Sequence, residues 1–344
     1  MEHGVDLAAL AGWMDSQGLG SGPLTDVTSL SGGTQNILLR FNRGGRAYVL
    51  RRPPLHLRGN SNKTMQREAR MLAALADSDV PHPRFIAACA DDSVLGAFFY
   101  LMQPIEGFNA TTGLPPYHAG SEAVRRRMGF SMVEAVAKLG ALDYRALGLE
   151  DFGKVDNYLE RQVDRWRSQL ESYREHAGWP GPECLPGVDR VAAWLAANVP
   201  PVFEPGIIHG DYHLANVMFR NDSPEMAAIV DWELTTIGDP LLDLGWMMAT
   251  WSETETPRPD DIAVQPWTGF PTIPELVDHY GKHSRRDLTH IKWYGVLACY
   301  KLALIIEGTH ARACAGKAPQ ETGDKLHAHA VSLLARALRW IDGE

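Results

Sequence analysis

The chain has 344 residues, of which 45% are hydrophobic and 22% are charged, a composition typical of ordinary globular proteins. This composition excludes disordered, collagen-like and fibrous classes, and the length suggests about two domains or two lobes. Lys and Arg total 33 against 42 for Asp and Glu, which gives a formal net charge of −9. Because a negative molecule repels polyanions, nucleic acids and anionic membranes are not expected partners.

The cysteines and the apolar stretches indicate the compartment. No Cys-x-x-Cys pair occurs, so we expect neither a zinc site nor a disulfide framework built on the cysteines. The N-terminus has no basic region followed by an apolar one, and the longest apolar stretch, 294–306, is interrupted by Lys301. That stretch is shorter than the about 20 residues that span a bilayer. These features favour a cytoplasmic protein with no membrane partner. The cysteines are Cys89, Cys184, Cys299 and Cys314.

The first hundred residues favour an antiparallel sheet with two helices. Apolar spacing predicts a helix over Asp6–Gln17. Apolar residues then alternate with polar ones on both sides of a turn at 42–45, which predicts a hairpin. A helix is expected to begin near Asn62 or Thr64, either of which could cap it, and to run to Ala76. Further strands are expected at 84–89 and 98–102.

After Gly107 the pattern becomes helical, except for a β-rich block over 206–231. The arrangement predicts an α+β protein with a small antiparallel-sheet lobe at 1–102, a connector at 103–107 and a larger helical lobe at 108–344. The expected helices are Glu122–Leu142, Asp156–Glu175, Val188–Asn198, Pro274–Ser284, Leu288–Arg312 and Asp324–Trp340.

The most informative segment is 208–219, followed by an apolar strand that ends at Asp231. A strand leads to Asp211 in a loop, and Asn216 follows five residues later. Phosphoryl transfer uses such a set, because one carboxylate orients the attacking hydroxyl and accepts its proton. An amide oxygen and a second carboxylate can hold the magnesium ion that neutralises the nucleotide phosphates. The segment therefore indicates a phosphotransferase.

The pattern His-Gly-Asp-x-x-x-x-Asn with a downstream Asp resembles the catalytic and metal-binding loops of the aminoglycoside phosphotransferase and choline kinase superfamily, relatives of protein kinases. The resemblance implies a bilobal protein-kinase-like fold. It also implies that Asp211 is the catalytic base and that Asn216 and Asp231 are magnesium ligands. The loop lacks the Arg of protein kinases, so a small-molecule kinase is favoured over a protein kinase.

Further parts of the same family pattern occur upstream in the expected order. Gly32, Gly33 and Thr34 lie between two strands, where the family places its nucleotide-covering loop. Arg51 ends the next strand at the position of the usual lysine, and Glu68 lies on the following helix as its ion-pair partner. Arginine in place of lysine is a departure from the family pattern. Arg52 is a competing candidate, but strand alternation favours Arg51 as the residue that faces the nucleotide.

The resemblance also assigns the segment between the lobes and a second acidic pair. Residues 98–104, which include Met102, would supply the hinge whose backbone faces the adenine ring. Asp239 and Asp243 lie in a segment that follows the metal-binding Asp in the family. We expect one of them to accept hydrogen bonds from the catalytic loop.

Several other groups have a functional and a plain structural interpretation. His209 and His213 have a spacing that could bind zinc on a helix, but Gly210 favours a hydrogen-bonded loop. The tryptophans at 166, 246, 251 and 293 could line a substrate pocket, although core packing is favoured. Arg125, Arg126 and Arg127 could meet coenzyme A phosphates or form an exposed helix face. Glu253 and Glu255 could attract a cationic substrate or be solvated.

Within the superfamily, the chain looks most like the bacterial phosphotransferases that resemble the kinase-like domain fused to certain animal acyl-CoA dehydrogenases. The residues that carry this likeness include 49–54, 148–153 and Asp231-Trp232-Glu233-Leu234. That branch is implicated in phosphorylating hydroxyacyl groups, so a hydroxy acid or its coenzyme A thioester is one acceptor hypothesis. An aminoglycoside or another amino alcohol is the second, and protein substrates are a distant third.

The resulting hypothesis is a kinase that uses ATP and Mg²⁺ to phosphorylate a hydroxyl group of a small molecule. Its rival from another class is an inactive nucleotide-binding module that regulates a partner, an alternative that the departure at Arg51 keeps open. The sequence assigns neither the acceptor, nor ATP over GTP, nor the oligomeric state.

Overall fold

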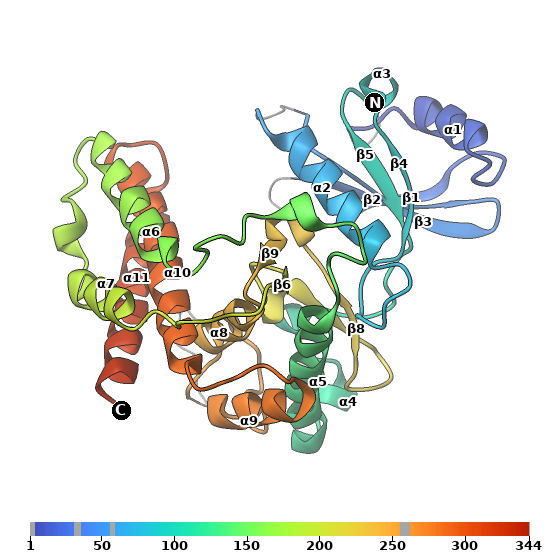
Figure 1. The fold of residues 1–344 in the computed structure, drawn as a ribbon. Coiled ribbons are helices and arrows are strands. Elements are labelled where there is room, and N and C mark those ends of the chain that lie inside the picture. Colours follow the sequence, from blue (N-terminus) through green and yellow to red (C-terminus); the bar gives the residue numbers. More distant parts are fainter. Residues whose placement is uncertain (1–3, 31–35, 56–58, 255–261, 344) are drawn as a thin grey trace. The chain divides into compact units, whose positions relative to one another are not determined.

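The computed structural model describes residues 4–30, 36–55, 59–254 and 262–343 (Figure 1). The chain divides into two compact units. The first unit contains residues 1–107 and 227–235, and the second contains 108–226 and 236–344. The segment 227–235, which the sequence analysis placed with the helical lobe, therefore groups with the sheet-containing unit.

The first unit is built on a five-stranded antiparallel sheet with strand order β1-β2-β3-β5-β4. The predicted hairpin is confirmed, because β2 pairs with β3 and Leu39 lies opposite Leu50. The elements of this unit are α1 (Leu7–Ser16), β1 (Thr25–Ser29), β2 (Ile37–Arg43), β3 (Arg46–Arg52), α2 (Ser61–Ala74), β4 (Phe85–Cys89), α3 (Asp92–Leu95), β5 (Phe99–Met102) and η6 (Trp232–Leu234).

The predicted helix at the N-terminus is confirmed as α1. Asp6 caps it, because its carboxylate accepts hydrogen bonds from the backbone N–H groups of Ala8 and Ala9, both at 3.0 Å. Leu10 and Met14 lie one turn apart and are buried in the core of this unit, which also contains residues of β2 and β5. The apolar stripe of α1 thus covers part of the sheet.

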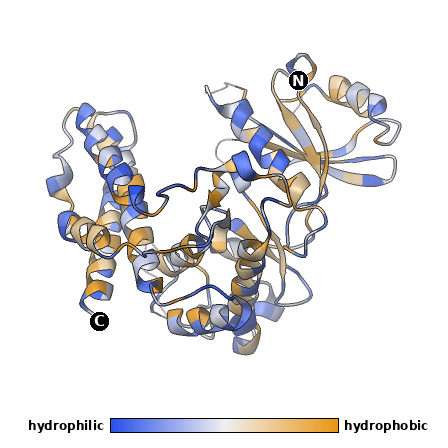
Figure 2. Cartoon of the chain, viewed as in Figure 1, coloured by the Kyte–Doolittle hydropathy of each residue, from blue (hydrophilic) through white to orange (hydrophobic). Residues whose placement is uncertain are grey.

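The cap expected for α2 was wrong. The helix begins at Ser61 with Asn60 at the N-cap, and no side chain caps it. Asn62 lies inside the first turn, where its side-chain oxygen instead accepts the backbone N–H of Phe98 at 3.2 Å. Figure 2 shows α2 as largely hydrophilic, which fits a helix that buries one narrow face. That face includes the carboxylate of Glu68, which is 2% exposed.

The second unit is mainly helical, as predicted. In addition, β6 pairs with β9 antiparallel, with Gly206 opposite Gly238. The main elements are α4 (Pro116–Ala119), α5 (Glu122–Ala141), α6 (Arg161–Ser172), α7 (Val188–Ala197), β6 (Gly206–Ile208), η5 (Leu214–Asn216), β7 (Val217–Phe219), β9 (Thr236–Gly238), α8 (Leu241–Thr250), α9 (Ile273–His283), α10 (Ile291–Cys314) and α11 (Gln320–Asp342), and β8 (Met226–Ile229) leads the chain back into the first unit. Short 3-10 turns occur at Ala110–Thr112, Glu150–Phe152, Tyr173–Glu175 and Pro182–Cys184.

The helix α8 was not predicted. Its sequence, LLDLGWMMAT, is apolar almost all round and has no polar face. Eight of its ten residues are buried. A helix buried on all sides has no helical period in its sequence, so apolar spacing cannot find it. Conversely, the expected helix 156–175 is shorter than predicted, because α6 begins at Arg161.

The arginine run on α5 does not form an exposed face. Arg125 is 4% exposed and donates hydrogen bonds to the backbone carbonyls of Thr268, His118 and Ala119. Arg126 forms an ion pair with Glu275 on α9. Arg127 forms ion pairs with two carboxylates, which are described below. The run therefore ties α5 to its neighbours, and an exposed, solvated face was the wrong interpretation for Arg125.

The four cysteines are free thiols, and Cys89 and Cys299 are buried. None of the helices in the described part of the chain combines the length and the apolar character that a bilayer span requires. No pair of the described cysteines is bonded in a disulfide.

A close approach between α8 and α10 gives the first prediction. A Cβ atom on Gly245 would lie 2.6 Å from the backbone carbonyl of Tyr294, so Gly245→Ala must push the two helices apart. We expect it to lower the free energy of unfolding by about 1–3 kcal/mol, as overpacking does. The matched control is Gly12→Ala on α1, where a Cβ meets nothing within 4 Å and helix propensity improves. Chemical denaturation that ranks Gly245→Ala at or above the control would contradict the packing described.

Candidate active site

A buried carboxylate fixes the loop that follows β6. The backbone N–H groups of His209 and Gly210 donate to the two oxygens of Asp243, at 2.6 and 2.8 Å. Asp243 lies on α8 and is 1% exposed. Burial raises the pKa of Asp243 to about 6, although the two backbone N–H groups oppose this shift. Of the two candidate residues in this segment, Asp243 is thus the one that anchors the loop.

Asp239 has a different task. It accepts the hydroxyl of Tyr294 at 2.5 Å and the backbone N–H of Leu241 at 3.0 Å. The second bond satisfies one of the free N–H groups in the first turn of α8. Asp239 therefore joins the start of α8 to α10.

The side chain of Asp211 is held by three donors. Its Oδ1 accepts the indole N–H of Trp246 at 2.9 Å and lies 3.1 Å from Nε2 of His213. Its Oδ2 accepts the amide N–H of Asn216 at 2.9 Å. Burial alone would raise the pKa of Asp211, but the hydrogen bond and charge of His213, together with His209 and Trp246, lower it to about 2. Asp211 is therefore a carboxylate at neutral pH.

Asn216 contacts Asp211 through its amide nitrogen, which donates to Oδ2 of Asp211. That nitrogen also donates to the backbone carbonyl of Asp211 at 3.0 Å. The amide oxygen is consequently directed away from Asp211 and is available as a hard ligand for a cation.

Asn109 fixes the same turn from outside the loop, and no sequence signal identified it. Its amide nitrogen donates to the carbonyls of Ala215 and Val217 at 2.7 and 3.1 Å. Its amide oxygen accepts the backbone N–H of Thr111 at 2.9 Å.

The two loop histidines do not form a zinc pair. The backbone N–H of Asp211 donates to Nδ1 of His209 at 3.4 Å. The other histidine, His213, caps η5 through Nδ1, which accepts the N–H of Ala215 at 3.2 Å, and turns Nε2 to Asp211. The predicted interpretation of hydrogen-bonded loop histidines is confirmed.

Trp246 and Lys301 are functional candidates that the sequence analysis did not select. Core packing was favoured for Trp246 over a place in a pocket wall; its side chain is 5% exposed, and its indole N–H donates to Asp211. The ammonium of Lys301 lies 4.4 Å from the centroid of the Trp246 ring and 5.4 Å from that of Trp166. Burial lowers the pKa of Lys301 to about 8, while Asp243 and Asp211 oppose the shift. The one available signal was that Lys301 interrupts the apolar stretch 294–306.

A pocket opens beside Asp211 in the second unit. Its volume is about 150 Å³. Apart from Asp211 and His213, the wall is mostly apolar. The wall residues are Asp211, His213, Trp246, Ala249, Thr250, Ile262, Leu302 and His329. The arrangement can place a small hydroxyl-bearing group against an ionised carboxylate.

The first unit holds a separate charged group centred on Arg51. Its Nε donates to Glu68 at 3.0 Å and its Nη2 to Asp231 at 2.9 Å. Burial alone would lower the pKa of Arg51, but Glu68 and Asp231 raise it, so Arg51 is a cation. Arg52 does not take part, because its Nε donates to the carbonyl of the adjacent Pro53. The alternation of β3 thus separates the two arginines as expected.

Glu68 and Asp231 are fixed by further contacts. Tyr100 and the backbone N–H of Trp232 are hydrogen-bonded to Glu68, in addition to Arg51. Burial raises the pKa of Glu68, and Arg51 opposes this. Asp231 has a left-handed backbone conformation, with φ of 64° and ψ of 65°, which aspartate tolerates better than most residues. The indole of Trp232 anchors the turn by donating to the carbonyl of Ile229 at 2.9 Å.

The other residues expected to contact the nucleotide are the glycine-rich segment and Met102. Gly32, Gly33 and Thr34 lie outside the described residues. Met102 is the last residue of β5, is 7% exposed, and pairs with Val49 of β3 and Phe85 of β4. The next residue, Gln103, continues the pairing through its N–H, which donates to the carbonyl of Arg84 at 2.8 Å.

The raised pKa of Asp243 predicts a pH-dependent stability. The folded carboxyl binds its proton more tightly than the unfolded one, whose pKa is 3.8. Its contribution is therefore fully present below pH 3.8 and is lost as the pH rises through about 6. We expect the difference in unfolding free energy between the wild type and Asp243→Asn, measured with urea from pH 4 to 7, to fall as the pH rises. A difference that rises over this range would contradict the burial argument.

Comparisons with known proteins identify the family of the chain. Residues 26–276 match the model of a family described as "Phosphotransferase enzyme family". Acyl-CoA dehydrogenase family member 11 of Rattus norvegicus is 30% identical over 331 residues, which are 93% of this chain and 41% of that protein. Family member 10 of Mus musculus is 27% identical over 89% of this chain and 28% of its own length. The chain thus spans less than half of these relatives.

Solved structures give the same result. A Ralstonia eutropha protein provisionally named as an aminoglycoside phosphotransferase has a TM-score of 0.80 at 29% identity and covers 97% of this chain and 99% of its own. ADP-bound aminoglycoside phosphotransferase APH(2'')-Ib has a TM-score of 0.60 at 15% identity over 96% and 99% of the two chains, which shows the fold alone. The α+β, bilobal kinase-like fold expected from the sequence is confirmed. The chain belongs to the phosphotransferase enzyme family.

Proposed function

We propose that this protein is a kinase that uses ATP and Mg²⁺ to phosphorylate a hydroxyl group of a small molecule. The observation that carries the proposal is Asp211, a carboxylate with a pKa of about 2 that three donors fix beside a pocket. In phosphoryl transfer such a carboxylate orients the acceptor hydroxyl and receives its proton late in the reaction. Most of the catalysis then comes from positioning and charge neutralisation.

The nucleotide is assigned to the first unit. We propose that Arg51, oriented by Glu68, contacts the phosphates, and that Gly32, Gly33 and Thr34 cover them. The segment that contains Met102 would face the adenine ring. This assignment is supported by the ion pair at 3.0 Å and by structural neighbours whose complexes contain ADP or AMP-PNP. Each of those neighbours is 15% identical to this chain, which shows the fold alone. Nucleotide binding by this chain is therefore a proposal.

Magnesium is assigned to Asn216 and Asp231, each of which offers an oxygen. The amide nitrogen of Asn216 is held by Asp211, which leaves its oxygen for a cation. Asp231 gives one oxygen to Arg51, and its side chain is 40% exposed. Amide and carboxylate oxygens are the donors that Mg²⁺ prefers, so both residues fit the ion. When bound, the ion would neutralise charge on the phosphates.

For the acceptor, we favour a hydroxy acid or hydroxyacyl thioester over an aminoglycoside. A cationic substrate needs free carboxylates, but Glu253 already accepts hydrogen bonds from Arg339 and Trp340 and lies 3.5 Å from Arg336. The pocket at Asp211 has apolar walls, including Ala249 and Leu302. Lys301 adds a positive charge near Asp211. Glu255 lies outside the described residues.

The arginine run on α5 does not support a coenzyme A site. Arg125 is buried against backbone carbonyls, and Arg126 and Arg127 are paired with carboxylates. A coenzyme A phosphate would have to displace these partners. The pocket therefore supports binding of the acyl part of the acceptor. It gives no support for binding of the nucleotide part of coenzyme A.

The experiment is ADP release from ATP and Mg²⁺ with a panel of hydroxy acids, hydroxyacyl-coenzyme A thioesters, aminoglycosides and choline. Asp211→Asn should lower turnover by about 10²–10⁴-fold, the usual contribution of a general base, with nucleotide affinity unchanged. Turnover by hydroxyacyl compounds alone would support the acceptor class, and turnover by aminoglycosides alone would refute it. ATP binding without any acceptor consumption would favour the inactive regulatory module.

Replacing the arginine by the usual lysine tests the nucleotide assignment separately. In Arg51→Lys one ammonium replaces a guanidinium whose separate nitrogens reach Glu68 and Asp231. We expect the KM for ATP to rise about tenfold, which corresponds to about 1.4 kcal/mol. Arg52→Lys is the matched control and should leave KM unchanged, because within the described part of the chain the Nε of Arg52 donates to the carbonyl of its neighbour Pro53. Equal KM values for Arg51→Lys and the wild type would remove Arg51 from the nucleotide site.

A further inference from the structure

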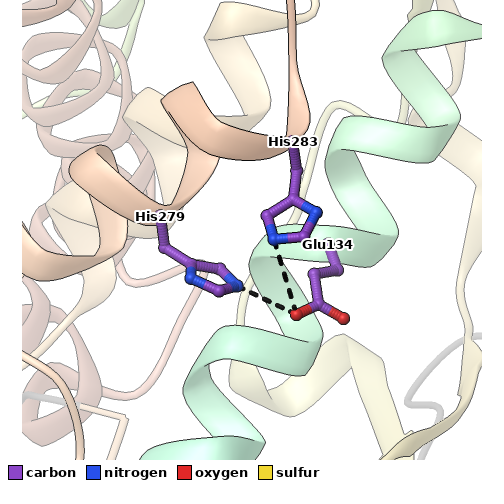
Figure 3. Close-up of side chains that lie close together, drawn as sticks. All are labelled: Glu134, His279 and His283. Carbon is purple, nitrogen blue, oxygen red and sulfur yellow. Dashed lines mark hydrogen bonds and ion pairs between the residues drawn. The ribbon is translucent and has the colours of Figure 1, made fainter.

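A cluster of metal-ligating side chains lies between α5 and α9, apart from the residues discussed above. Figure 3 shows Glu134 on α5 and His279 and His283 on α9, with both imidazoles directed at the carboxylate. The two histidines are four residues apart, so they lie on one face of α9. Two helices thus bring two imidazole nitrogens and one carboxylate oxygen together.

The distances suit a single ion. Nε2 of His279 lies 2.9 Å from Oε1 of Glu134, and Nε2 of His283 lies 3.9 Å from the same oxygen. All of the ligand atoms lie within 4.8 Å of one another. In a tetrahedral zinc site with bonds of about 2.0–2.1 Å, ligand atoms are separated by about 3.3 Å. The two measured distances fall on either side of that value, so small side-chain rotations would complete the geometry.

We propose that Glu134, His279 and His283 form a binding site for a divalent transition-metal ion of the zinc type. Imidazole nitrogen and carboxylate oxygen together suit Zn²⁺, whereas Mg²⁺ takes oxygen ligands almost exclusively. Three protein ligands leave one coordination position for water or another small ligand. The site is independent of the magnesium and nucleotide assignments.

The local charge favours a cation. Arg127 forms ion pairs with both Glu134 and Glu225, so one guanidinium is shared between two carboxylates. If both histidines are neutral, the cluster has one net negative charge. The hydrogen bonds from Arg127, opposed by burial, lower the pKa of Glu134 to about 2. The oxygen that faces the histidines is therefore ionised, as a metal ligand must be.

The same surroundings orient the ligands. Arg127 donates to both oxygens of Glu134 and so fixes the plane of the carboxylate. Phe130 stacks on the ring of His279, with centroids 4.3 Å apart. Partners of this kind hold ligands in place and raise metal affinity. The side chain of His283 is 43% exposed, which gives an ion access from solvent.

A second cluster among the described residues, Cys184, Glu307 and His327, is less suited to a metal. Its carboxylate is fully buried and contacts Trp179, His310 and His327, so an ion has no path from solvent of the kind that the exposed His283 gives to the first cluster. Burial and the charge of Glu307 raise the pKa of Cys184 to about 12, so the thiol does not ionise readily to the thiolate that binds metal. It serves as a matched control.

The test is titration of the metal-free full-length protein with Zn²⁺ by calorimetry, and with Co²⁺ by visible absorption, in excess Mg²⁺. Magnesium occupies oxygen-ligand sites, so the remaining binding reports on nitrogen ligands. We expect one equivalent to bind. His283→Gln should lower the affinity for the ion by more than about 100-fold, the upper limit for losing a residue that only orients a ligand. His327→Gln, in the second cluster, should bind like the wild type. Circular dichroism checks that both variants are folded.

Thermal unfolding supplies an independent readout. An ion that joins α9 to α5 stabilises the folded state by mass action, so Zn²⁺ should raise the Tm of the wild type and of His327→Gln but not of His283→Gln. No binding above the Mg²⁺ background would overturn the proposal. So would binding that His283→Gln leaves intact, or binding that only His327→Gln abolishes.

Discussion

The loop that contains Asp211 depends on one buried interaction, in which Asp243 accepts the backbone N–H groups of His209 and Gly210. Gly210 has a φ of 88°, so the loop leaves the strand geometry of β6 and its N–H groups need another acceptor. Trp246 lies three residues after Asp243 on the same face of α8 and donates to Asp211. One helix therefore fixes both the backbone of the loop and the direction of its carboxylate. Packing of α8 against α10 in turn fixes that helix.

In the first unit, ion pairs rather than backbone hydrogen bonds fix the charged side chains. Arg51 is buried between Glu68 and Asp231, so the group has two carboxylates and one guanidinium. That excess negative charge suits a site for a divalent cation. Arginine reaches both acids through different nitrogens, whereas lysine has a single ammonium. Arg51 in place of the usual lysine is consequently compatible with the ion pair that the family pattern requires, because the turn at Asp231 places that carboxylate within reach of a second guanidinium nitrogen.

The sequence predicted features that depend on neighbouring residues in the chain, and it missed contacts between distant segments. The apolar stripe of α1, the turn at 42–45 and the alternation that separates Arg51 from Arg52 are local, and the structure agrees with each. The helix α8 was missed because a fully buried helix has no polar face. Trp246, Lys301 and Asn109 were missed because their contacts join segments far apart in the chain. Apolar periodicity predicts helices and strands but not contacts between distant segments.

The charge around Asp211 also bears on the acceptor that we propose. Asp211 receives hydrogen bonds from Trp246 and Asn216, and its charge opposes the burial that lowers the pKa of Lys301. A carboxylate so stabilised is a weak base, which suits a reaction whose transition state transfers the proton late. An amino alcohol would bring a cation to a pocket in which the one ionised carboxylate among the wall residues is already stabilised by these donors. An uncharged hydroxyl on an apolar chain meets no such conflict, because its hydrogen can approach Asp211 while its chain contacts Ile262 and Leu302.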